Sequence, residues 1–157
     1  MSLSDNMTHR AGLGHILRPG LFWLAVAILG ALAFFWNGID ALLVAWQLPE
    51  YSHGPLIPVL SLLLFLRQLK EHPVTPGVKT DRWPGVALVV VSLLLGALGT
   101  FSRIHDIVAY ALILWVGGIL LISFGWRTGR HFWPPVLHLV YMLPLPGTIY
   151  YKVSTSL

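Results

Sequence analysis

Long apolar runs separated by short polar or basic stretches dominate the chain and predict a bundle of membrane-spanning helices. A helix needs about 20 apolar residues to cross the roughly 30 Å hydrocarbon core, where every backbone polar group must be satisfied within the protein. Five segments approach this length, at residues 21–36, 52–66, 84–101 and 107–125 and in a stretch that begins at residue 132. We therefore predict an all-α fold, a polytopic integral membrane protein with about five transmembrane helices.

The first segment, Leu21–Trp36, has 16 residues, and at about 1.5 Å per residue it reaches roughly 24 Å. Its residues Ala31–Ala33, downstream of a basic stretch, also imitate the cleavage site of a secretory signal peptide. Because the apolar run continues to Trp36 and further apolar segments follow, we favour an uncleaved helix. Residues 1–18 are then a cytoplasmic leader, and residues 19–157 form one transmembrane module.

A short helix is predicted between the first two spans, within Asn37–Glu50. Apolar side chains recur there at spacings of three and four, which places them on one face of a helix. These residues are Ile39, Leu42, Leu43 and Trp46. We expect this helix to lie along the outer membrane interface.

The third and fourth spans are joined by only five residues, 102–106. So short a connection predicts an antiparallel hairpin. Ser92, Gly96 and Thr100 recur every four residues along the third span. Small side chains at this spacing allow two helices to approach closely, so we assign these three residues a packing role.

Prolines interrupt the fifth segment, which begins at Phe132 and cannot be one straight helix. They are Pro134, Pro135, Pro144 and Pro146. The 12 residues from Phe132 to Leu143 would reach only roughly 18 Å as a helix. Two interpretations follow: a kinked helix that continues to Tyr151, or a broken helix that lines a water-filled cleft opening to the outside.

Basic residues are distributed unevenly between the two ends of the predicted spans. If five segments alternate in direction, eight basic residues fall on one side and two on the other. Since cytoplasmic loops carry the excess of Lys and Arg, the N-terminus is predicted to lie inside. The larger group is Arg10, Arg18, Arg67, Lys70, Lys79, Arg82, Arg127 and Arg130, and the smaller group is Arg103 and Lys152.

Composition supports a membrane protein and excludes several function classes. Hydrophobic residues make up 56% of the chain and charged residues 10%, whereas about a quarter of the residues of a soluble domain are charged. The basic residues flank the spans and form no face with interleaved aromatic residues, so no nucleic-acid partner is predicted. The chain has no cysteine, which excludes disulfides, thiolate metal sites and thiol catalysis by these residues.

The tetrapeptide Tyr51–Gly54 is the strongest candidate for a functional element. A structural role accounts for most of it, with Tyr51 at the interfacial belt, Ser52 as a helix cap, and Gly54 with Pro55 starting the second span. His53 is not explained in this way, because an imidazole can orient a substrate carboxylate or hold a partner across the interface. A serine-hydrolase pair is excluded, since neighbouring residues on a helix point roughly 100° apart.

Two further sets of polar residues carry weaker signals. Arg103, His105 and Asp106 cluster between the third and fourth spans, where Asp106 suits a helix N-terminus and Arg103 can pair with it. His138 lies within the fifth segment, where a hydrogen bond to a neighbouring helix and a functional role both remain open. The histidines lie at different depths, which disfavours axial haem ligation. No cofactor or metal site is predicted.

The sequence YSHGPLIP at residues 51–58, together with YMLPLP at residues 141–146, resembles the N-terminal half of the exosortases. The resemblance runs from about Trp36 to Leu157. It implies a cysteine protease or transpeptidase of the bacterial inner membrane that processes C-terminal tails bearing a Pro-Glu-Pro motif, an apolar helix and basic residues. In that family the thiol nucleophile and its arginine and histidine partners lie further along. The resemblance therefore implies a membrane portion that is inactive alone.

What the resemblance implies for the site is substrate contact by one group of residues, namely Tyr51, Ser52, His53, Gly54, Pro144 and Pro146. The implied partners are membrane lipid, the sorting-signal helices of exported proteins and the missing C-terminal half of the enzyme. The alternative is a non-catalytic multi-pass scaffold or a transporter fragment. Transport predicts polar residues that face one another in mid-membrane, and here only His138 and a few Ser and Thr qualify.

Thiol labelling tests the predicted orientation without background, because the chain has no cysteine. Ser102→Cys, between the third and fourth spans, should react with a membrane-impermeant thiol reagent in intact cells. Thr80→Cys, between the second and third spans, should react only after lysis, because the more basic side is cytoplasmic. The reverse pattern would overturn the orientation and place His53 inside.

Overall fold

The computed structural model describes residues 22–72, 81–144, 151–152 and 154–156. The chain divides into two compact units, residues 1–34 and 35–157. In the first unit the described residues form one helix, Phe22–Phe34. The predicted leader at residues 1–18 lies outside the described residues, as do Pro146 and Lys79.

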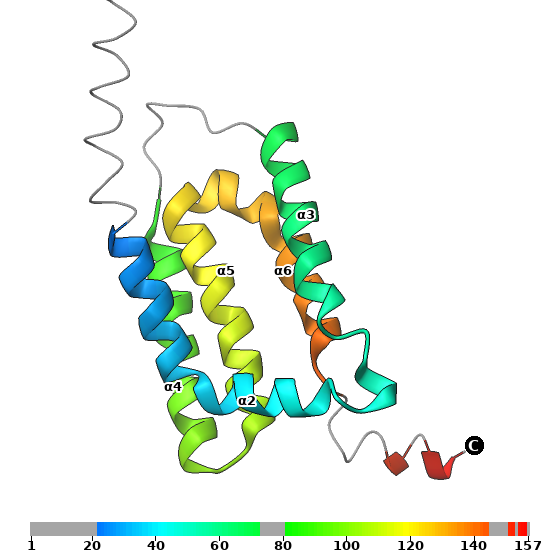
Figure 1. The fold of residues 1–157 in the computed structure, drawn as a ribbon. Coiled ribbons are helices and arrows are strands. Elements are labelled where there is room, and N and C mark those ends of the chain that lie inside the picture. Colours follow the sequence, from blue (N-terminus) through cyan, green and yellow to red (C-terminus); the bar gives the residue numbers. More distant parts are fainter. Residues whose placement is uncertain (1–21, 73–80, 145–150, 153, 157) are drawn as a thin grey trace, which may run out of the picture. The chain divides into compact units, whose positions relative to one another are not determined.

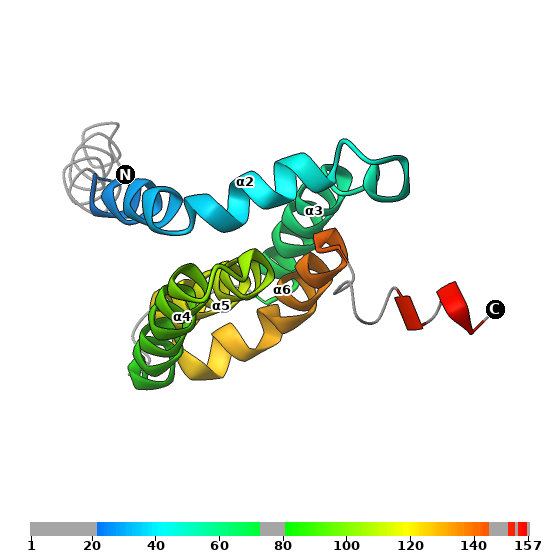
Figure 2. The ribbon, with the colours of Figure 1, turned by 90° about the horizontal axis from the view of Figure 1, so that it is seen from below.

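The described residues of the second unit form helices joined by turns (Figure 1). Figures 1 and 2 show α2 lying crosswise at one end of the longer helices. Contacts between elements give the neighbour order α4, α5, α6, α3, with α2 against α5. The elements are α2 (Trp36–Ala45), η1 (Pro49–Tyr51), α3 (Leu56–Glu71), α4 (Trp83–Phe101), α5 (His105–Gly129), η2 (Arg130–Phe132), α6 (Trp133–His138) and η3 (Leu139–Met142).

Helix α2 confirms the short helix predicted between the first two spans. Leu42 is buried on it, whereas Leu43 is 45% exposed. The apolar face is therefore narrower than the spacing alone indicates. Trp46 follows the last residue of α2, and its backbone N–H donates to Leu42 O over 2.9 Å.

Helices α4 and α5 form the predicted antiparallel hairpin. Gly85, Ser92, Gly96 and Gly99 are the buried residues of α4, so the packing role assigned to Ser92 and Gly96 is confirmed, whereas Thr100 is exposed. Buried small residues let the two backbones approach closely, as in other membrane helix pairs.

The hairpin turn ends α4 with a Schellman motif. Ile104 N–H donates to Gly99 O over 2.9 Å, and Arg103 N–H donates to Thr100 O over 3.2 Å. Arg103 takes the left-handed position of this motif with a φ of 56°. Glycine is the usual residue there, because a Cβ makes the conformation costly.

The prediction of five transmembrane helices is wrong. Among the described residues, three helical segments are long and apolar enough to cross a membrane, namely Pro49–Glu71, Trp83–Phe101 and His105–Met142. A fourth is counted only if Phe22–Phe34 and α2 together make one broken span. The fifth segment was wrongly predicted to be a span, because it forms a short arm that turns back beside α5.

That return arm comprises α6 and η3, Trp133–Met142. Gly125 interrupts α5 with a φ of 72° and a ψ of 170°, and the chain then turns back along α5 and α3 (Figure 1). Ten residues from Trp133 to Met142 reach roughly 15 to 20 Å, well short of the hydrocarbon core. Pro134 and Pro135 fit the first turn of α6, where a missing N–H costs nothing.

The prediction that the second span ends before Arg67 is also wrong, because α3 continues to Glu71. Arg67 Nε donates to Glu71 Oε1 over 3.0 Å on the exposed face of the last turns. Exposed i,i+4 pairs of this kind stabilise a helix by only about 0.3–0.5 kcal/mol. Long basic side chains can extend from a helix end toward the membrane surface, so the apolar run need not stop at the first of them.

One end of the second unit gathers most of its described basic residues. The imidazoles of His72 and His131 stack there with centroids 4.7 Å apart, and Trp126 N–H donates to Asp81 O over 2.9 Å. These contacts bring together the end of α3, the start of α4 and the turn after α5. The basic residues at this end are Arg67, Lys70, Arg82, Arg127 and Arg130.

Replacement of Gly85 tests the close approach of α4 and α5. A Cβ at Gly85 would lie 2.6 Å from Ile122 N and 2.9 Å from Gly118 O. Gly85→Ala should therefore destabilise the purified protein by about 1–3 kcal/mol in a denaturation series, since rigid backbone must move. Gly117→Ala is the control, because its Cβ would lie 3.4 Å from Val136 Cγ1. Equal losses in both variants would refute the close approach.

Candidate functional site

The tetrapeptide Tyr51–Gly54 forms a series of tight turns between α2 and α3. Gly54 N–H donates to Tyr51 O over 2.8 Å, and Leu56 N–H donates to His53 O over 3.0 Å. Helix α3 begins only at Leu56, with Pro55 at its N-cap and no capping side chain. The predicted cap role of Ser52 is wrong, because its hydroxyl donates to Pro49 O over 3.0 Å.

Gly54 is buried against the indole of Trp46. A Cβ built on Gly54 would overlap the indole atoms Cδ1 and Nε1. Only glycine leaves room for this contact. The structure thus explains Gly54 by packing against a residue eight positions earlier in the sequence.

The same indole joins the turn to the return arm. Trp46 Nε1–H donates to Met142 O over 3.0 Å, across 96 positions of sequence. A buried cluster of Leu42, Ala109, Ile113, Met142 and Leu143 surrounds this contact, with Trp46 and Ile57 packed against it. Leu143 is extended, with a ψ of 138°, as expected for a residue that precedes a proline. The two stretches YSHGPLIP and YMLP therefore meet at one end of the second unit.

The side chains of the tetrapeptide differ in what they can still contact. His53 and Ser52 are exposed and Tyr51 is half-buried. Among the described residues His53 makes no side-chain hydrogen bond, so its imidazole is free to meet a ligand. Pro144 is half-buried at the end of the arm. The predicted water-filled cleft beside Pro144 and Pro146 falls largely outside the described residues.

Sequence reasoning missed a polar contact within the helices. Ser61 Oγ and His138 Nδ1 lie 2.8 Å apart and join α3 to α6. The signal that could have found it is Ser61, a polar residue in an apolar run that faces the segment carrying His138. This contact confirms the hydrogen bond to a neighbouring helix that was one of the two expectations for His138.

The pair Ser61–His138 lacks the surroundings of a nucleophile. Ser61 is only 4% exposed, and neither residue lines the apolar cavity described below or the smaller polar pocket beside Arg103. Acyl transfer needs an accessible hydroxyl and donors for an oxyanion. The contact therefore fixes the helices, where an unpaired hydroxyl or imidazole would be costly.

The charged cluster at the hairpin turn lies at the same end as the tetrapeptide (Figure 1). Arg103 and His105 line a pocket of about 300 Å³ together with Asn37, Gly99 and Thr100. The predicted pairing of Arg103 with Asp106 does not occur, since the one ion pair of the described residues is Arg67–Glu71. Asp106 does lie in the first turn of α5, where the helix dipole favours a carboxylate.

These features define a multi-pass membrane protein whose two motif stretches converge at one end. The family model of transmembrane exosortases matches residues 45–157. The chain belongs to this family. Searches of curated proteins and of solved structures gave no significant match.

A double-mutant cycle tests the contact between Gly54 and Trp46. Gly54→Ala should destabilise the protein by about 1–3 kcal/mol in a denaturation series, because the methyl group overlaps the indole. The loss should shrink in a Trp46→Leu background, where the smaller side chain leaves room. Ser52→Ala, on the exposed face of the same turn, should change stability by less than about 0.5 kcal/mol. The same loss for Gly54→Ala in both backgrounds would rule out the contact.

Proposed function

We propose that this chain is the substrate-receiving membrane portion of an exosortase that processes C-terminal sorting signals for protein export. The reaction is cleavage or transfer of a peptide bond by a cysteine thiolate. Residues 1–157 hold no cysteine, so the nucleophile must come from polypeptide outside these residues. The chain supplies the surface on which the substrate tail is held.

A single observation carries this proposal, namely the hydrogen bond from Trp46 Nε1–H to Met142 O. It brings the tetrapeptide Tyr51–Gly54 and the arm that leads into Pro144 to one end of the unit. In our topology that end faces the outside, because the basic residues of the described helices gather at the other end. A tail that crosses the bilayer presents its Pro-Glu-Pro motif on the outer side.

Each predicted site residue has a role in this scheme. His53 and Ser52 offer exposed polar groups to the substrate backbone or to its glutamate, and Tyr51 supports the turn. Gly54 keeps the turn against Trp46. Pro144 ends the return arm at the same end as the tetrapeptide, and we assign substrate contact to it and to Pro146.

A transporter fragment fits the polar residues of the described helices less well. Transport needs several polar groups that face a pathway across the membrane. Within the described helices Ser61 and His138 are hydrogen-bonded to each other, with 2.8 Å between Oγ and Nδ1. The larger cavity is apolar, with one charged residue at its edge. This arrangement supports a docking role.

Substitution of His53 tests the proposed function in a complete enzyme, made by co-expressing this chain with the downstream half of a related exosortase. His53→Asn should slow cleavage of a Pro-Glu-Pro tailed reporter at unchanged membrane abundance. The expected rise in activation free energy is about 1–3 kcal/mol, the value of one lost hydrogen bond. Asn is well tolerated in turns and helix starts, so a purely structural His53 predicts no effect.

Two controls accompany this measurement. His72→Asn changes an exposed histidine at the opposite end of the unit and should leave processing unchanged. The chain by itself should cleave no reporter, because a thiolate is absent. Full processing by His53→Asn would show that the tetrapeptide has only a structural role. Processing by the isolated chain would contradict the assignment to a cysteine enzyme.

A further inference from the structure

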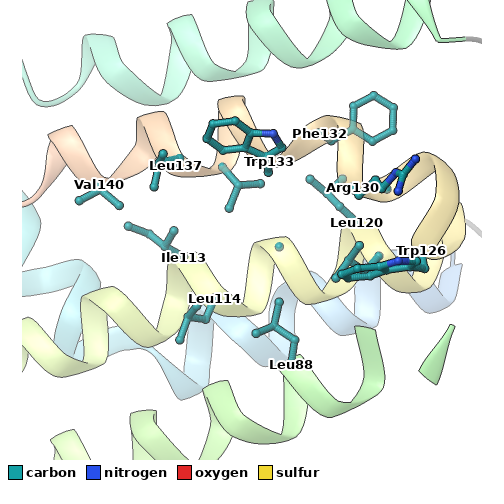
Figure 3. Close-up of a pocket in the computed structure, with 14 residues that line it drawn as sticks. Leu88, Ile113, Leu114, Leu120, Trp126, Arg130, Phe132, Trp133, Leu137 and Val140 are labelled. Atoms are coloured by element: carbon teal, nitrogen blue, oxygen red, sulfur yellow. The ribbon is translucent and has the colours of Figure 1, made fainter. Parts of the chain in front are cut away.

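An apolar cavity of about 470 Å³ opens between α4, α5 and the return arm. Its walls are hydrophobic side chains, including Leu88 of α4 and Leu137 of α6 (Figure 3). Gly117 of α5 also lines the cavity, and a Cβ there would lie 3.4 Å from Val136 Cγ1 and 3.6 Å from Leu88 Cδ2. The volume falls within the roughly 300–1,000 Å³ range of small-ligand sites.

The two ends of this cavity differ in chemistry. Figure 3 shows Arg130 and Trp126 at one end and Val140 at the other. Arg130 is the one charged residue among those that line the cavity. Trp126 and Trp133 are 47% and 60% exposed, and such tryptophans prefer the level of lipid headgroups.

We propose that this cavity binds one anionic phospholipid, with an acyl chain along its apolar walls and the phosphate at Arg130. Basic pockets between membrane helices on the cytoplasmic side recognise anionic headgroups in this way. Guanidinium and phosphate form strong charge-assisted hydrogen bonds, often in a bidentate arrangement. Trp126, which lies beside Arg130 in Figure 3, suits the glycerol level of such a lipid.

A polypeptide helix fits this cavity poorly. A spanning helix is roughly 10 Å wide and 30 Å long, which corresponds to roughly 2,400 Å³. The cavity offers about 470 Å³. The basic end of a sorting-signal tail would also lie beside Arg130 and meet a like charge. A slender acyl chain with an anionic head satisfies both the volume and the charge.

Three exposed charges belong to this end of the unit but do not line the cavity. They are Arg82, Arg127 and Asp81, whose carboxylate accepts from Trp83 N–H over 3.1 Å. Arg127 therefore serves as the matched control for Arg130, since both are exposed arginines at the same end of the unit.

Native mass spectrometry of the full chain, released from vesicles of equal parts phosphatidylglycerol and phosphatidylcholine, tests the site. The native chain should retain one phosphatidylglycerol in preference to phosphatidylcholine. Arg130→Gln should weaken this retention roughly fivefold, the value expected for one interfacial cation. Arg130→Lys and Arg127→Gln should both retain the lipid. Equal retention of the two lipids, or equal losses in Arg130→Gln and Arg127→Gln, would overturn the proposal.

A second measurement does not depend on the folding of an arginine variant. A photo-crosslinking amino acid in place of Leu137, which is 54% exposed, should capture a phospholipid in cells. The adduct should have the mass of phosphatidylglycerol or another anionic phospholipid. Capture of a polypeptide, or of phosphatidylethanolamine in proportion to its abundance, would contradict a specific anionic lipid site.

Discussion

The indole of Trp46 is the contact on which the arrangement of the second unit depends. Its ring fills the space that Gly54 leaves, and its Nε1–H donates to Met142 O over 3.0 Å. One side chain thus fixes the turn before α3 and the end of the return arm at the same time. A tryptophan suits this task because a large apolar ring and one donor occur in the same group. The motif stretches are neighbours because both contact Trp46.

The membrane environment explains why the return arm is held by polar contacts as well as by packing. Apolar side chains gain little from burial against one another when lipid is equally apolar, so close packing and hydrogen bonds decide how helices associate. The hairpin of α4 and α5 relies on glycine at its contact surface. The return arm is too short for such a contact surface. It is held by the Ser61–His138 contact along its length and by Trp46 at its end.

Helices whose apolar residues run without interruption could be predicted from the sequence, and those that prolines and glycines interrupt could not. The limits of α4, the hairpin and the existence of α2 follow from hydropathy, loop length and spacing, which are local properties, whereas α2 ends at Ala45 and not near Glu50. The predicted number of spans was wrong because Gly125 and the prolines turn the fifth segment back beside α5. The tetrapeptide was recognised as a candidate, but the reason for Gly54 lay in Trp46, and no spacing rule links Trp46 to Met142 or Ser61 to His138.

The modest length of α3 has a consequence for the turn that precedes it. The 16 residues of α3 rise about 24 Å, some 6 Å less than an average hydrocarbon core. The segment Pro49–Glu71 is long enough to cross a membrane only because it includes the residues before α3. The backbone of that turn therefore lies at the edge of the hydrocarbon, where its N–H and C=O groups need partners within the protein. Bonds such as Gly54 N–H to Tyr51 O supply them, so the turn can enter the membrane surface without leaving those groups unpaired.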